Sequence, residues 1–230
     1  MNARFDQGQT PLHVVSQLGQ VDVVRSLIKR GAKLNAENEA KETPLSLVAR
    51  NGNEEATKVL LENNAKVDHQ DVEGRTPLHR ASKNGHEAIT QSLLKSRAST
   101  DAKNVYDWTA LHLASQTGKS EVVQVLLRSG ADINLLNDFG WSALHMASRK
   151  GHRDVVELLL SNGGNVDTQE TARGETALHL AAYYGNIAVA KLLINRGANL
   201  NVRNKNAQTP LDLAMSEDHL DVALLLEVRS

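Results

Sequence analysis

The chain has 230 residues, and its 26 lysines and arginines are balanced by 27 aspartates and glutamates, which leaves a formal net charge of −1. This balance argues against binding driven mainly by nucleic-acid phosphates or anionic lipids, because such ligands require a basic excess or patch. The lack of cysteine excludes disulfides, a thiolate nucleophile and cysteine-ligated zinc or iron–sulfur sites. Only 3% of the residues are aromatic, so we expect a core of Leu, Val, Ile and Ala.

The sequence contains no segment that is typical of membrane insertion or secretion. Residues 1–10 are polar and lack the apolar stretch of a signal peptide. No apolar run approaches the roughly 18 residues that a membrane-spanning helix requires. We therefore expect an intracellular protein in the cytoplasm, with the nucleus as the alternative compartment.

One four-residue signature recurs along the whole chain, first as Thr-Pro-Leu-His. Its seven copies begin at Thr10, Thr43, Thr76, Thr109, Ser142, Thr176 and Thr209. Successive copies are 33, 33, 33, 33, 34 and 33 residues apart, and the one extra residue lies in a loop between Asp167 and Gly174. A fixed period of this length is typical of repeat proteins. The sequence therefore predicts a single repeat domain over residues 1–230.

Each copy is predicted to form two helices. In the first copy, Thr10 is a suitable N-cap and Pro11 fits the first helical position, where its missing N–H costs nothing. The second helix carries apolar residues at helical spacing, and both helices end at a glycine in most copies. Asn64, Arg97 and Asp218 replace such glycines, so we expect a left-handed backbone there, at a cost of about 1 kcal/mol for Arg97. The polar segment that follows each pair is predicted to be a hairpin or an extended loop.

The 33-residue period and the signature resemble those of ankyrin repeats, and the block Gly151–Leu160 strengthens the resemblance. The resemblance implies an all-α ankyrin-repeat solenoid of stacked helix–turn–helix units with projecting β-hairpin loops. Each unit would bury its apolar face only against its neighbours. In the last copy Asp212 replaces the signature histidine, and Glu217 to His219 replace the usual glycine turn. We interpret this copy as a C-terminal cap.

No residue pattern indicates catalysis, a metal site or a cofactor. Neither a nucleophile elbow nor a phosphate-binding loop is present. Five histidines share one slot of the signature, but stacked helices lie about 8–10 Å apart, so successive histidines cannot converge on one zinc ion. We expect each to bond a neighbouring backbone group. These histidines are His13, His79, His112, His145 and His179.

The aromatic residues indicate where a partner binds. In ankyrin repeats, partners usually contact the hairpin tips and the exposed end of the first helix. Six of the seven aromatic residues occupy those positions in copies four to six, and three basic residues lie among them. We expect this concave face to bind a protein or peptide with acidic and apolar groups. The predicted contact residues are Tyr106, Trp108, Phe139, Trp141, Arg149, Lys150, Arg173, Tyr183 and Tyr184.

Other interpretations remain open at the level of sequence. The aromatic residues could face outward only because they do not fit a tight Leu/Ala core. The array could be the regulatory arm of a larger enzyme, channel or receptor, or a monomer in its own right. Nucleic-acid binding through the aromatic and basic residues is disfavoured by the neutral charge. The first three copies carry a mixed-charge face that we expect to be solvated, formed by Glu39, Glu42, Arg50, Glu73, Arg75 and Lys83.

Overall fold

The computed structural model of the chain describes residues 2–229, which contain fourteen α-helices, one short 3-10 helix (Asp6–Gly8) and no β-strand. The helices form seven pairs, as the repeat predicts. The first helices are α1 (Pro11–Gln17), α3 (Pro44–Asn51), α5 (Pro77–Asn84), α7 (Ala110–Gln116), α9 (Ala143–Lys150), α11 (Ala177–Tyr183) and α13 (Pro210–Ser216). The second helices are α2 (Val21–Lys29), α4 (Glu54–Glu62), α6 (Glu87–Lys95), α8 (Ser120–Arg128), α10 (Arg153–Ser161), α12 (Ile187–Asn195) and α14 (Leu220–Glu227).

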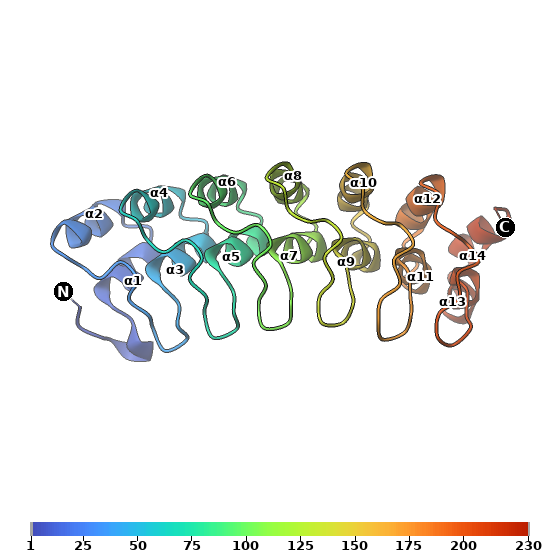
Figure 1. Ribbon diagram of the computed structural model, residues 1–230, viewed down its shortest axis with the longest axis horizontal. Coiled ribbons are helices and arrows are strands. Elements are labelled where there is room, and N and C mark those ends of the chain that lie inside the picture. Colours follow the sequence, from blue (N-terminus) through green and yellow to red (C-terminus); the bar gives the residue numbers. More distant parts are fainter. Residues whose placement is uncertain (1, 230) are drawn as a thin grey trace. The chain divides into compact units, whose positions relative to one another are not determined.

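The pairs are grouped into two compact units. The first comprises the residues up to Ala110 together with Arg128–Ala131, and the second comprises Leu111–Leu127 and the residues from Asp132 onward. In the first unit, α1, α3 and α5 lie side by side in one row, and α2, α4 and α6 form a second row against it (Figure 1). The second unit repeats this arrangement with α9, α11 and α13 in one row and α10, α12 and α14 in the other.

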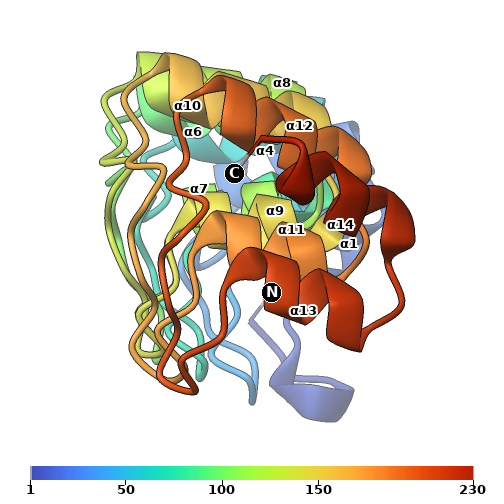
Figure 2. The same ribbon diagram turned by 90° about the vertical axis from the view of Figure 1, so that its right-hand side faces the viewer.

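Long loops connect each helix pair to the next. Within each unit they project from the row of first helices, on the side away from the second helices (Figures 1 and 2). The loops are hairpin-like, but they carry no strand ladder within residues 2–229. Instead, neighbouring loops are tied by single backbone hydrogen bonds, such as Val105 N–H to the Glu73 carbonyl in the first unit and Lys205 N–H to the Arg173 carbonyl in the second.

The core is built from small and medium aliphatic side chains, as the composition predicts. The signature leucine is fully or almost fully buried in each of the first six copies, for example Leu45 and Leu178, and so is a leucine of most second helices, for example Leu60 and Leu159. No aromatic side chain is among the buried apolar residues of the described chain. Burying one such leucine stabilises the fold by roughly 2–3 kcal/mol.

Glycines end the first helices for two physical reasons. Gly118 has φ +70°, which side chains rarely adopt, and the His152 ring lies 2.7 Å from the position a Cβ would take. Gly185 has the same relation to His219. These two histidines donate from Nε2 to the carbonyls of Gln116 and Tyr183, so each joins its own helix pair to the preceding one.

Left-handed backbone also occurs where the sequence lacks glycine. Asn64, Arg97 and Asp218 have φ values of 64°, 66° and 56°, as predicted. At the positions equivalent to Arg97, Gly31, Gly130, Gly163 and Gly197 have no atom within 4 Å of an added Cβ. The strain at Arg97 is therefore a property of its backbone and not of crowding.

Arg97→Gly is expected to stabilise the protein by about 0.5–1 kcal/mol, because it removes the cost of a side chain in the left-handed region. The reciprocal control, Gly130→Arg, places the same side chain at an equivalent position and should destabilise by a similar amount. Urea unfolding followed by circular dichroism measures both. Equal or lower stability of Arg97→Gly would contradict this account of the helix end.

Candidate partner-binding surface

The loops that carry the predicted aromatic residues are shaped by one side chain in each copy. In the first unit, Asn104 Oδ1 accepts hydrogen bonds from the backbone N–H groups of Tyr106 (2.9 Å) and Trp108 (3.0 Å). In the second unit, Asn137 Oδ1 does the same for Phe139 (3.0 Å) and Trp141 (2.9 Å). Such side-chain-to-backbone bonds fix turns that no strand supports. The aromatic side chains therefore start from an ordered backbone.

The copy with the extra residue uses a longer side chain for the same purpose. Glu170 stands where the other loops have Asn or Asp, and it is buried. Its Oε1 accepts from the backbone N–H of Glu175 at 3.1 Å, and its Oε2 accepts from that of Ala172 at 2.7 Å. The additional methylene thus spans a loop that is one residue longer. The insertion leaves the geometry of the signature unchanged.

Four residues of the second unit form a compact aromatic–basic group, which we term the Arg149 cluster: Trp141, Arg149, Tyr183 and Tyr184. The Arg149 guanidinium carbon lies 5.3 Å from the ring centroids of both Trp141 and Tyr184. Its Nε donates to the Tyr184 hydroxyl at 3.0 Å. Tyr183 contacts Tyr184 edge to face, with centroids 5.0 Å apart. Stacking of this kind orients an arginine while leaving its terminal NH2 groups available.

The remaining five predicted contact residues lie outside the Arg149 cluster. Phe139 is 52% exposed, at the tip of the loop that ends at Trp141. Lys150 and Arg173 are also exposed, but within residues 2–229 no ion pair, hydrogen bond or cation–π contact joins them to the Arg149 cluster. Tyr106 is 54% exposed and Trp108 is half-buried. Both lie on the first unit.

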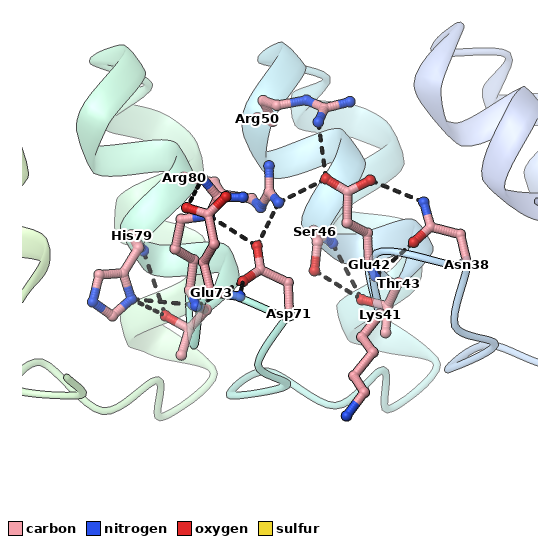
Figure 3. Close-up of polar contacts among 12 residues, drawn as sticks. Asn38, Lys41, Glu42, Thr43, Ser46, Arg50, Asp71, Glu73, His79 and Arg80 are labelled. Carbon is pink, nitrogen blue, oxygen red and sulfur yellow. Dashed lines mark hydrogen bonds and ion pairs between the residues drawn. The ribbon is translucent and has the colours of Figure 1, made fainter. Parts of the chain in front are cut away.

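A buried ion network occupies the first unit and was not foreseen from the sequence. Arg80, only 6% exposed, contacts Asp71 Oδ2 (2.5 Å) and Glu42 Oε1 (2.6 Å), and lies between these two carboxylates in Figure 3. Arg50 pairs with Glu42 at 2.9 Å, and Arg75 pairs with Asp71 at 2.9 Å. The prediction of a solvated mixed-charge face was wrong for Glu42, which is buried. We term Glu42, Arg50, Asp71, Arg75 and Arg80 the Arg80 network.

Two departures from the repeat could have revealed this network. Arg80 stands on the first helix where the other six copies have Val, Leu or Met, and Asp71 stands where four other loops have Asn. Burial by itself would raise the pKa of Asp71. Hydrogen bonds from Arg75 and the charge of Arg80 together have the larger, opposite effect, so the pKa of Asp71 lies below its usual value. The carboxylate therefore remains ionised, and the cations and anions of the network pair with one another, although the buried Nε of Arg80 has no hydrogen-bond partner.

The signature histidines are structural, as predicted. In the second unit, His145 Nδ1 accepts from the Ser142 backbone N–H at 3.1 Å, while Nε2 lies 3.2 Å from the Glu175 carbonyl of the next copy. A carbonyl can only accept, so Nε2 carries the proton and the ring is neutral. Burial lowers the pKa of His145 to about 4. His13, His79, His112 and His179 each make the same bond to the loop of the following copy.

No group of three or more His, Asp or Glu side chains that could hold a metal ion occurs within the described residues. Over the same part of the chain, no helix combines the length and apolarity that crossing a bilayer would take. Stacked helix pairs with projecting loops define a helical repeat protein (Figure 1).

Comparison with known proteins identifies the family. The family model for ankyrin repeats matches three overlapping segments, residues 12–104, 97–170 and 144–228. The chain therefore belongs to the ankyrin-repeat family, whose repeats are generally non-catalytic protein-interaction modules.

Solved structures agree with this assignment. The crystal structure of the human ASB11 ankyrin repeat domain is 30% identical, with a TM-score of 0.88, and the match covers 96% of this chain and 98% of that one. No curated protein sequence matches the chain significantly. In total 634 solved chains match, so the fold is too widespread to specify a partner by itself.

Acid is expected to weaken the fold through the buried histidines. Because the pKa of His145 is lower in the folded protein, the unfolded chain binds protons first as the pH falls below about 6.5. The stability that the neutral, buried His145 ring contributes to the fold is fully present above that pH. It is lost as the pH falls toward 4, and the loss amounts to about 3 kcal/mol. His145→Ser introduces the residue that the second copy carries at this position, Ser46. This variant should lower the free energy of unfolding at pH 7.5, and the decrease should be much smaller at pH 4.5. A difference in unfolding free energy that does not change with pH would contradict this.

The Arg80 network is expected to respond to substitution as a coupled unit. Arg80→Leu or Asp71→Asn alone removes one counter-charge from a buried partner and should destabilise by about 3 kcal/mol. The double variant restores residue types found in other copies and should recover most of that loss. A double-mutant cycle from urea unfolding at pH 7 measures the coupling, with Lys58→Ala in the exposed pair with Glu55 as the control. Additive single effects would rule out the coupling.

Proposed function

We propose that the chain is a protein-interaction module that binds an acidic and apolar segment of a partner at the Arg149 cluster. The observation that supports this proposal is the placement of one guanidinium against two partly exposed aromatic rings, Trp141 and Tyr184. A carboxylate of the partner would pair with the terminal NH2 groups of Arg149. Apolar side chains beside that carboxylate would pack on the rings and on exposed Phe139.

The cluster is held by ordered elements. Trp141 follows a loop closed by Asn137, Arg149 lies in the last turn of α9, and Tyr184 is the C-cap residue of α11. The contacts of Arg149 with both rings hold its long side chain in one orientation, which reduces the conformational entropy lost on binding. Together these features favour recognition of a short segment by a preformed surface.

The partner chemistry is expected to include both charge and apolar surface. A purely acidic segment would leave the rings uncovered, whereas a purely apolar one would bury the guanidinium without a counter-charge at a cost of several kcal/mol. Tyr106 and Trp108 on the first unit offer a second aromatic pair. We expect this pair to add apolar contact area for a partner.

The test uses peptides selected from a random displayed library against the purified chain, with binding measured by titration calorimetry. Selected peptides are expected to carry Asp or Glu beside an apolar residue. Trp141→Ala and Arg149→Ala should each weaken binding by about 2 kcal/mol, and Trp108→Ala plus Trp141→Ala should weaken it by more than about 2 kcal/mol without unfolding the chain. Arg149→Lys should recover little, because lysine lacks the planar fork.

The chain's own tryptophans provide a site-specific readout. Trp108 and Trp141 are the only two in the sequence, so Trp108→Phe leaves Trp141 as the single fluorophore. Its emission should change on peptide binding, and Arg128→Ala, at an exposed basic residue of α8, should bind like the wild type. Selection of peptides without acidic residues, or full affinity of Arg149→Ala, would show that the cluster is not the binding site.

A further inference from the structure

The outer side of α14 carries an apolar stripe that the rest of the fold does not cover. Leu220, Leu224 and Val228 are 66%, 62% and 77% exposed, and their spacing of four residues places them on one face of the helix. Met215 of α13 is also exposed. Helix α14 packs mainly against α12 and α13, and in Figure 2 these helices lie at the end of the second unit that faces the viewer.

Two of the three stripe positions are apolar in the last copy alone, whereas the position of Leu220 is also apolar in the first and sixth copies, as Val21 and Ile187. At the position of Leu224 the other six copies carry Arg25, Lys58, Gln91, Gln124, Glu157 and Lys191. At the position of Val228 they carry Lys29, Glu62, Lys95, Arg128, Ser161 and Asn195. Each of these residues is polar, so the repeat pattern predicts a solvated ridge. Contiguous exposed apolar residues of this kind mark an interaction surface.

We propose that this stripe pairs with the same stripe of a second copy of the chain, with the two α14 helices antiparallel about a two-fold axis. If Leu220 packs on Val228 of the second copy, Leu224 lies opposite its own counterpart near the axis. The stripe is therefore complementary to itself, as a closed two-fold interface requires.

The charges that flank the stripe fit the same arrangement. A shallow groove beside it is lined by Ile187, Lys191, Asp221, Leu224, Val228 and Arg229. Asp221 lies in the first turn of α14, and Arg229 lies just beyond its last turn, where its Nη1 bonds Asn195 Oδ1 at 3.4 Å. Antiparallel pairing brings Asp221 of each copy to Arg229 of the other, which makes two ion pairs. Parallel pairing would oppose like charges at both ends.

The predicted contact is small, since it involves one helix and its flanks from each chain. Interfaces below about 1,200 Å² are weak, so we expect a reversible dimer that forms in the micromolar range. The surface lies on the second helix and its neighbours, whereas the Arg149 cluster lies on the loops and the first helices. The pairing does not depend on the proposed binding function.

Sedimentation velocity of the whole chain from about 1 to 500 µM tests the proposal, a range chosen to span the affinity of a weak interface. The wild type should move from one-chain to two-chain mass as concentration rises. Leu224→Lys, which introduces the residue found at Lys58 and Lys191, should weaken dimerisation at least roughly tenfold. Val72→Lys, at an exposed apolar residue of a loop tip, is the matched control and should dimerise like the wild type.

Charge reversal tests the orientation independently of the apolar stripe. Asp221→Arg and Arg229→Asp should each weaken self-association, because each opposes like charges across the axis. The double variant, or an equimolar mixture of the two single variants, should restore it. A wild type that stays monomeric throughout the range would overturn the proposal. So would a Leu224→Lys variant that dimerises normally, or charge variants that fail to rescue one another.

Discussion

The fold depends on a constraint that no single repeat can satisfy: the apolar face of each helix pair must be covered by the next pair. The signature histidine is the polar counterpart of this packing. Its Nδ1 accepts from the N-cap of its own helix, and its Nε2 donates to a loop carbonyl of the following copy, as in His145 with Ser142 and Glu175. One neutral ring thus closes a helix start and aligns the next loop. Burial favours this neutral form, so the hydrogen bonds and the lowered pKa have the same cause.

Because apolar packing and histidine hydrogen bonds hold the helix pairs together, other side chains are free to serve in binding, and these lie on the outside of the fold. Leu, Val and Ala fill the space between pairs, and a ring the size of tryptophan has no place among them. Loop backbones are ordered by Asn137 and its equivalents, so residues on them do not need to contribute to the core. Trp141 and Tyr184 can therefore meet Arg149 on the outside of the second unit without loss of stability. The proposed binding surface is a product of residues that the fold leaves unconstrained.

The sequence predicts the parts of the structure that follow from periodicity. The helix pairs, the left-handed positions of Arg97 and Asp218 and the histidine hydrogen bonds all repeat with the signature. Pairings between non-equivalent positions do not follow from a periodic pattern. Arg80 reaches Glu42 of the preceding copy and Asp71 of its own loop, and only the spatial register of helices and loops brings these three together. In the same way, Arg149 and Tyr184 are 35 residues apart in the sequence, and only the packing of one helix pair on the next brings the two side chains into hydrogen-bonding distance.

Departures from the repeat are of two kinds, and the difference between them bears on function. Where a departure lies inside, a second departure compensates it: Arg80 replaces an aliphatic residue, and Asp71 supplies its counter-charge. Likewise Glu170 offsets the inserted loop residue. The aliphatic residues Leu224 and Val228 replace polar residues on the outside, and nothing within the described chain covers them. A compensated departure is accounted for by its own pairing within the fold. An uncompensated apolar one is costly in water and is better explained by contact with another molecule, which favours α14 and the Arg149 cluster, rather than the Arg80 network, as the surfaces of the contacts proposed above.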